Sequence, residues 1–443
     1  MLYTRIKPRK RKPNWRNILL TLLCVVLLAT SVTLLVKSIP AWVRPGDVSL
    51  ENSPTPPTPG IDPTVQPYAT PTATPEVTPA PEITPEPTEA PTPTPKRGSG
   101  VQSITIGAVG DVKLHEHALK AAKSGNSYDF TNFFGFIQPY ISWQDVVIAD
   151  LDAAVAEGTV SVTRAPAALL DGLSAAGVDV VTLANATVET EGAEAAEATV
   201  LTAAQAGLTA VGSEGAAPVI LEKDDLRIAL LNYAVTEAET AAVHELTDVN
   251  LTNDLAYLGT DPLGVDFVIV CIDWNLEDGT KLTDLQKEWV KKLSDAGVDV
   301  VLGSGTQVPQ AMTTIQNAEG HKTLVAHGLG NFLSGYRKDG KDAGVIVNFT
   351  LTKDFDNETT SIDAVSYAPT WVLKYSAQGK YSFEIMPAAE YADKHYRNMA
   401  KTDKERIAKV PAEIENAVST SAGSMDKTVR KMVDGVSTVV MEE

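Results

Sequence analysis

The sequence predicts an α/β layered domain preceded by a single membrane-spanning helix and a disordered Pro/Thr-rich linker. From Val101 onward, apolar strand-like runs alternate with helical stretches, as in strand–helix–strand units. Before that point, a basic head, an uncharged apolar run and a proline-rich tract follow one another. The predicted divisions are a basic cytoplasmic head (1–17), a transmembrane helix (18–38), the linker (39–100), the α/β domain (101–388) and a charged helical C-terminal tail (389–443).

The apolar run favours a retained membrane anchor over a cleaved signal peptide. It reads ILLTLLCVVLLATSVTLLV and holds 19 residues without a charge. At ~1.5 Å per residue such a helix spans roughly 28 Å, which is enough for a hydrocarbon core. It is longer than usual signal-peptide cores, and the following SIPAW is a poor cleavage site. The seven Lys/Arg of the head predict a cytoplasmic N-terminus and an extracellular remainder at the cell membrane. We expect the lipid bilayer as a partner through residues 18–38 and no nucleic acid.

The linker and the composition add two expectations. Residues 45–100 contain more than half of the 27 prolines, which predicts an extended spacer that reaches at most roughly 150 Å. The whole chain carries a formal charge of -19, and removing the +7 of the head leaves -26 on the remainder. Cys24 lies in the apolar run and Cys271 in a predicted buried strand, so we expect no disulfide.

Each element of the folded part is predicted from its local pattern. Runs such as VDVV, without polar alternation, indicate strands covered on both faces, and stretches that end in glycine indicate helices. Later segments alternate more strictly and are typical of antiparallel strands. The predicted strands are 104–111, 146–152, 178–185, 208–213, 267–274, 298–305 and 322–332; the helices are 166–177 and 284–297; a hairpin is 218–234; and the antiparallel segments are 344–351, 365–375 and 383–388.

A near-repeat indicates where a site should lie. SAAGVDVV (174–181) and SDAGVDVV (294–301) are the same unit of helix end, glycine stop and buried strand. Polar or small residues follow both, in LANATVETEG and LGSGTQVPQ. Ligands of open α/β sheets bind at the carboxyl ends of the strands, so these loops are the expected place for a site.

The strand-end segments, taken in order, resemble the CapA family of poly-γ-glutamate capsule biosynthesis proteins over about residues 103–350. GDVKL (110–114) fits the family's opening GD-V-M-L, and ADLD (149–152) stands where the family has N-L-E. LANATVETEG (183–192) is similar to L-A-N-N-H-x-x-D-x-G, and GLGNF (328–332) to S-L-G-N-F. The resemblance implies a calcineurin-like metallophosphatase layered sandwich, with divalent metals held by Asp, Glu, Asn and His beside an anionic substrate.

The family's histidine positions do not carry histidine in this chain. They are occupied by Thr187, Asp273, Ser304 and Gln307. Imidazoles suit transition metals, and a two-metal site needs a full ligand set. We therefore expect degenerate metal-ligand motifs, no metal or other cofactor, and no catalytic residues. The candidate pocket left over contains Asp111, Asp150, Asp152, Asn185, Asp273, Trp274, His327 and Asn331.

An oxygen-rich remainder leaves one alternative open. Asp111, Asp152 and Asp273 could hold a single Mg²⁺ or Ca²⁺, because hard cations prefer oxygen ligands. The favoured interpretation is structural: Asp111 and Asn331 satisfy backbone donors in tight loops, as short polar side chains commonly do.

These features predict a membrane-anchored extracellular CapA-like protein associated with the biosynthesis of capsule, poly-γ-glutamate or another cell-surface polymer. The replacement of the family's ligands favours a protein that is not an enzyme. Such a pseudo-metallophosphatase would bind the polymer or its synthesis complex. Two alternatives remain: an altered single-cation hydrolase or transferase acting on an anionic surface polymer, and a stalked protein-binding surface module.

Overall fold

The computed structural model describes most of the chain from Arg97 onward. The predicted head, the predicted span and nearly all of the linker lie outside the described residues. Within the part of the chain that is described, no helix has the length and apolar character needed to cross a bilayer. The described residues are 97–155, 158–236, 241–276, 279–338, 340–377, 379–392, 394, 396, 399–419, 429–433 and 436–440.

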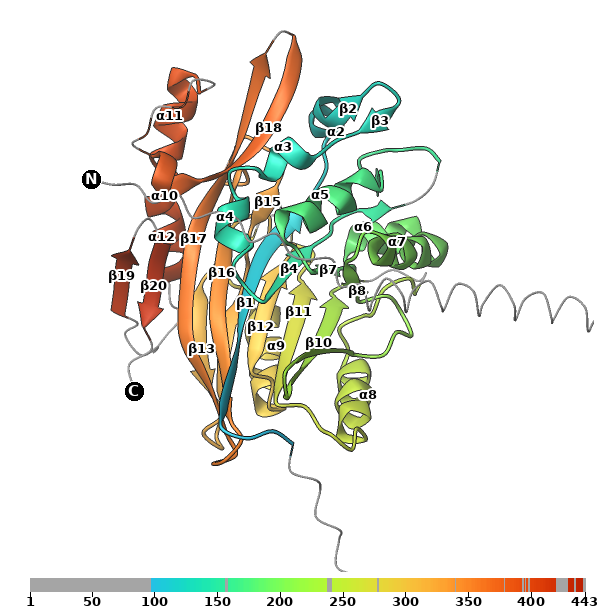
Figure 1. The fold of residues 1–443 in the computed structure, drawn as a ribbon, viewed down its shortest axis with the longest axis vertical. Coiled ribbons are helices and arrows are strands. Elements are labelled where there is room, and N and C mark those ends of the chain that lie inside the picture. The colour runs from blue at the N-terminus through green and yellow to red at the C-terminus, as the bar shows by residue number, and fades with distance from the viewer. Residues whose placement is uncertain are drawn as a thin grey trace, which may run out of the picture. The chain divides into compact units, whose positions relative to one another are not determined.

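The first sheet joins parallel and antiparallel strands around β1 (Figure 1). Its order is β19-β20-β17-β16-β1-β4-β7-β8, with β15 paired to the end of β1 and β18 paired to β17. The parallel strands are β1 (Val101–Val112), β4 (Val146–Asp150), β7 (Val180–Thr182), β8 (Thr209–Val211) and β15 (Asn331–Leu333). The antiparallel strands are β16 (Ala343–Asp354), β17 (Thr359–Ala377), β18 (Lys380–Pro387), β19 (Val429–Val433) and β20 (Val436–Val440).

The second sheet has the order β13-β14-β12-β11-β10-β9. Its four central strands are parallel, and an antiparallel strand closes each edge. The hairpin predicted at residues 218–234 is confirmed as its β9–β10 edge. The strands are β9 (Val219–Lys223), β10 (Leu226–Ala234), β11 (Phe267–Asp273), β12 (Val300–Ser304), β13 (Met312–Gln316) and β14 (Lys322–Ala326).

Apolar side chains from both sheets meet in a shared inner core, as Ile106 and Ile269 do. Helices cover the outer face of each sheet, so the layers are helix, sheet, sheet, helix. This arrangement confirms the α/β layered prediction. The first sheet is covered by α2 (Glu116–Ala122), α3 (Thr131–Phe134), α4 (Gln138–Ile141), α5 (Ala168–Ala176) and α7 (Ala193–Gln205), and the second by α8 (Asp248–Gly259) and α9 (Asp284–Asp295). The remaining short elements are β2 (Lys123–Ser124), β3 (Ser127–Tyr128), β5 (Ala154–Val155), β6 (Arg164–Ala165) and α6 (Ala186–Glu191).

The near-repeat makes the same hydrogen bond between adjacent strands in both sheets. Asp179 accepts a hydrogen bond from Val147 N (3.0 Å), at the start of the neighbouring strand β4. Asp299 accepts the equivalent bond from Val268 N (2.7 Å) on β11. In each VDVV the aspartate therefore satisfies a backbone donor of the adjacent strand, while the valines fill the cores.

The C-terminal region is not the all-helical tail that the sequence analysis predicted. The helices α10 (Ala388–Tyr391), α11 (Lys401–Ile407) and α12 (Val410–Ser419) place apolar side chains, such as Ile414, in the inner core. β19 and β20 then extend the first sheet alongside β17. The physical reason is local: VRKMV and VSTVV are rich in β-branched residues and flank an Asp-Gly pair, a pattern typical of a hairpin.

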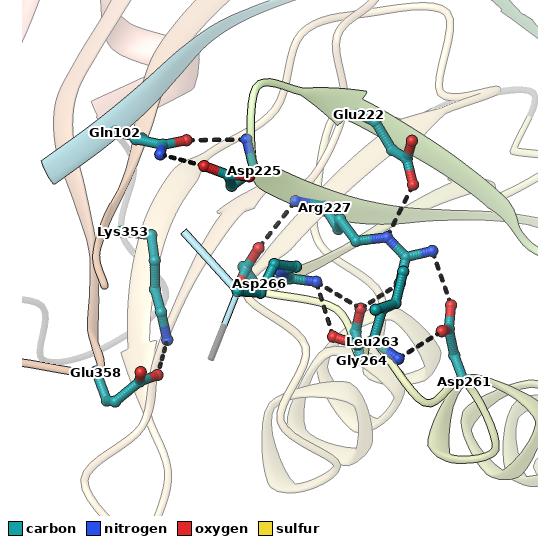
Figure 2. Close-up of polar contacts among 11 residues, drawn as sticks. Gln102, Glu222, Asp225, Arg227, Asp261, Leu263, Gly264, Asp266, Lys353 and Glu358 are labelled. Carbon is teal, nitrogen blue, oxygen red and sulfur yellow. Dashed lines mark hydrogen bonds and ion pairs between the residues drawn. The ribbon is translucent and has the colours of Figure 1, made fainter. Parts of the chain in front are cut away.

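The folded domain begins four residues before the predicted boundary at Val101. Arg97 Nη1 donates to the carbonyls of Leu263 (2.8 Å) and Gly264 (3.0 Å), and Arg97 Nη2 forms an ion pair with Asp266. Arg227 reinforces the same loop: its backbone N–H donates to Asp266 (2.8 Å), and its guanidinium pairs with Asp261 (2.8 Å) (Figure 2). These contacts fix the start of the domain at the end of β1 opposite to Asp111.

Replacement of Arg97 by alanine is expected to lower the free energy of unfolding by about 2 kcal/mol, because Asp266 is buried and would lose its cation. Denaturant unfolding of the purified full chain measures this loss. Lys120→Ala is the matched control, since its ion pair with Glu116 is solvent-exposed. Equal effects of the two substitutions would contradict a structural role for Arg97.

Candidate functional site

Three of the predicted carboxylates line one small cavity. Asp111 lies at the end of β1, Asp152 follows β4, and Asp273 ends β11. The cavity has a volume of about 50 Å³, enough for a few waters but not for a polymer segment. The sequence analysis predicted that these three carboxylates lie in one pocket, from their positions after strands and from the family resemblance. The other residues lining the cavity are Lys113, Ala186, Thr187, Asn275, Leu276, Gly305 and Gln307.

Two glycines permit the strands to approach so closely. A β-carbon on Gly110 would lie 1.8 Å from the carbonyl oxygen of Gly330. Gly305 has φ +68°, and a β-carbon there would lie 2.2 Å from Asp273 Oδ1. Any larger residue at either position would push apart the strand ends that carry the carboxylates.

Asp111 is buried, and among the described residues only one of its two carboxylate oxygens has a hydrogen-bond partner. Its Oδ1 accepts a hydrogen bond from Gly305 N (3.0 Å), whereas its Oδ2 has no hydrogen-bond partner among the described residues. Burial, and then the negative charge of Asp152, raise the pKa of Asp111 to about 7, and the Gly305 N–H only partly offsets them. The backbone-satisfying role that the sequence analysis favoured for Asp111 is therefore present, but it uses one oxygen of two.

Two further carboxylates lie beside Asp111. Asp150 accepts a hydrogen bond from Thr182 Oγ1 (2.7 Å), and Asp273 accepts one from Asn275 N (2.6 Å). Burial, and then the charge of Asp273, raise the pKa of Asp150 well above its ordinary value. Burial, and then the charge of Asp111, do the same for Asp273. The carboxylates thus act on one another as closely spaced like charges.

Lys113 supplies the positive charge of this cluster, and the sequence analysis missed it. Its ammonium forms an ion pair with Asp152, which also accepts a hydrogen bond from Thr187 Oγ1. Burial lowers the pKa of Lys113, but the negative charges of Asp152, Asp111 and Asp273 outweigh burial and raise that pKa, so the amine stays protonated. A signal was present: Lys113 stands where the family motif has methionine, two residues beyond Asp111, and residues two apart in extended chain share a face.

The other predicted residues do not line the cavity but hold the loops around it. Asn185 caps α6, accepting from Val188 N (2.9 Å) and donating to the Leu151 carbonyl (2.8 Å). Asn331 donates to the carbonyls of Gln307 (3.1 Å) and Lys341 (2.8 Å).

Trp274 and His327 belong to the packing of the second sheet. Trp274 Nε1 donates to the His327 carbonyl (2.8 Å). The His327 ring contacts Thr313 Oγ1 (3.1 Å), and burial lowers the pKa of His327 to about 4. Among the residues that line the cavity, none is a histidine.

The residues present do not fit the dinuclear metal centre that the resemblance implies. Thr187 and Gln307 line the cavity at two of the family's histidine positions. Ser304, at a third, donates a long hydrogen bond to the Ile272 carbonyl (3.4 Å). Lys113 brings an ammonium into the place where a cation would have to bind. Within the described residues, no group of three or more His, Cys, Asp and Glu is arranged to hold a metal ion.

The comparison with protein-family models shows which family the chain belongs to. The model described as "Bacterial capsule synthesis protein PGA_cap" matches residues 105–336, which is more than half of the chain. The chain belongs to this family. The match covers every residue of the cavity, from Asp111 to Gln307, so the cavity lies within the family region. We call this cavity, lined by Asp111, Asp152 and Asp273, the carboxylate cleft.

The solved structures similar to this chain include two phosphoesterase-type proteins. One is a novel phosphatase from Mycoplasma pneumoniae, at 15% identity and a TM-score of 0.38, covering 61% of this chain and 94% of that one. The other is the calcineurin-like phosphoesterase YfkN from Bacillus subtilis, at 11% identity and a TM-score of 0.37, covering 71% and 97%. The search of curated proteins returned no match.

Proposed function

We propose that this PGA_cap family protein is a non-catalytic, membrane-anchored extracellular module. It binds a cell-surface polymer or assists the complex that makes it, and its domain is a calcineurin-like sandwich that has lost its metals. The observation that carries the proposal is the Lys113 ammonium, paired with Asp152 inside the carboxylate cleft.

The proposal follows from charge and space. A divalent cation bound between Asp111, Asp152 and Asp273 would be repelled by the ammonium in the same small cavity. No residue that lines the cavity supplies an imidazole or a thiolate to hold a transition metal. The remaining scaffold then serves binding rather than hydrolysis.

The anchoring part of the proposal is supported by the sequence. An uncharged 19-residue apolar run follows a basic head, and a Pro/Thr-rich spacer separates it from the domain. Such a spacer would hold the domain away from the bilayer.

Addition of Mn²⁺, Zn²⁺ or Mg²⁺ to the purified full chain is expected to leave its melting temperature unchanged and to produce no phosphodiesterase turnover of a generic ester. A single divalent cation that bound the folded state would raise the melting temperature by mass action. Metal-dependent turnover that the Asp111→Ala variant abolishes would contradict the proposal.

A second candidate is a hydrolase or transferase that uses one hard cation on an anionic surface polymer. The observation that favours it is the pair of buried, unsatisfied oxygens Asp111 Oδ2 and Asp150 Oδ2. Mg²⁺-dependent turnover without any transition metal would support this candidate, provided that Lys113→Met increases the turnover.

A further inference from the structure

Two cations of the first sheet and its loops have no carboxylate partner within 4 Å among the described residues. Lys374 on β17 donates from its ammonium to His117 Nδ1 (2.6 Å), and Arg337, in the loop after β15, donates to the Tyr336 carbonyl (2.6 Å). Burial lowers the pKa of Arg337 to about 10, and the charges of Asp342 and Asp403 partly offset this effect. Asp342 forms its own ion pair with Arg406 (2.7 Å). Among the described residues, neither Lys374 nor Arg337 is therefore held in an ion pair.

Both cations lie near the ring of Phe383 on β18. The Arg337 guanidinium carbon lies 5.6 Å, and the Lys374 ammonium 5.8 Å, from the centroid of Phe383 on β18. Burial, and then the positive charge of Arg337, lower the pKa of Lys374. The two positive charges therefore repel each other, and a negative charge bound beside both would relieve this repulsion.

The positive charge of Arg337 also acts on His115, which lies just beyond the end of β1. Burial lowers the pKa of His115, and the charges of Lys113 and Arg337 lower it further. The His115 ring accepts a hydrogen bond from Gly335 N (3.0 Å), which ties the loop that carries Arg337 to the end of β1. In Figure 1, α2 packs against β18, so His117 on α2 lies beside the antiparallel pair of β17 and β18.

Aromatic rings flank the cations. Tyr381 is 41% exposed, lies 4.6 Å from the Lys374 ammonium and contacts the His117 ring at a centroid distance of 4.4 Å. Tyr336 meets the His115 ring edge-on at 4.6 Å. Exposed rings next to cations can pack against the methylenes of a chain while the cations bind its charges.

We propose that His117, Tyr336, Arg337, Lys374 and Tyr381 form a binding surface for an anionic polymer that carries repeated carboxylates on an aliphatic chain. We call these five residues the cation–aromatic surface. The inference rests on the proposed function, because it assigns the place where the domain would take a surface polymer. It also explains how a domain of strongly negative net charge could bind a polyanion: the positive charge is concentrated locally.

The test is a binding titration of the purified full chain with poly-γ-glutamate, with polyphosphate and uncharged dextran as comparison polymers. The wild type is expected to bind poly-γ-glutamate more tightly than polyphosphate, and dextran not at all. The double variant Arg337→Gln/Lys374→Gln should weaken binding at least about tenfold, the loss of roughly 1.4 kcal/mol. The matched control is Lys287→Gln/Lys291→Gln, which removes the same charge from the exposed face of α9 and should bind as the wild type does.

Tyr381→Ala gives a second readout that keeps both charges, and it is expected to weaken binding while melting like the wild type. If the wild type binds poly-γ-glutamate and the variants bind it equally well, the surface is wrong but the proposed function stands. If the wild type binds none of the three polymers, the polymer-binding part of the proposed function is contradicted as well. Equal affinity for polyphosphate would overturn the assignment to carboxylates.

Discussion

Replacement of Lys113 by methionine, the residue at this place in the family motif, is expected to destabilise the protein by about 3 kcal/mol at pH 8. The substitution keeps the length of the side chain but leaves Asp152, whose side chain is only 10% exposed, without its ion-pair partner. It also removes the one ammonium that acts on Asp111 and Asp273. Denaturant unfolding of the full chain at pH 8 measures the loss.

Two controls isolate the charge. Lys113→Arg retains a cation and is expected to recover most of the stability. In the methionine variant, millimolar Mg²⁺ should raise the melting temperature more than it does in the wild type, because the carboxylates then lack a positive charge. A methionine variant as stable as the wild type at pH 8 would show that the ammonium does not compensate the cluster.

Replacement of Asp111 by asparagine is expected to stabilise the protein, increasingly as the pH rises from about 4 to about 7. The pKa of Asp111 is raised from 3.8 to about 7, so between these values the folded state keeps a proton that the unfolded chain releases. The contribution of Asp111 to the free energy of unfolding therefore falls with rising pH, by at most about 1.4 kcal/mol per pH unit, and levels off above pH 7.

Asparagine imitates the neutral carboxyl and still accepts the hydrogen bond from Gly305 N, so it avoids this loss. The difference between variant and wild type should be small near pH 4 and largest above pH 7, on the order of 2–4 kcal/mol. Asp171→Asn, at an exposed carboxyl on α5, should show no such trend. A pH-independent difference for Asp111→Asn would contradict the raised pKa.

The layered fold was predictable because its signals are local and repeated. The two VDVV units, the glycine stops of the helices and the hairpin pattern at residues 218–234 each indicate one element, and the strand–helix alternation orders them. The helical tail was predicted wrongly at residues 429–440. There the pairing with β17 is a long-range contact that helical periodicity in the preceding residues does not foretell.

The convergence of Asp111, Asp152 and Asp273 was also predictable, because each follows or ends a strand, where ligands of α/β sheets bind, and the family motifs mark these positions. The roles of their neighbours were not. Trp274 was assigned to the candidate pocket, but its indole donates to the His327 carbonyl instead. Lys113 was passed over because a search for metal ligands looks for histidines and carboxylates and does not ask which cation could replace a metal.

The most direct test of the central claim is the elemental metal content of the full chain, purified without chelators. Lys113 is proposed to fill the electrostatic place of the family's metals, so the wild type should contain far less than one equivalent of Mn, Fe, Zn or Mg per chain. Two tightly held transition-metal ions per chain would contradict the account.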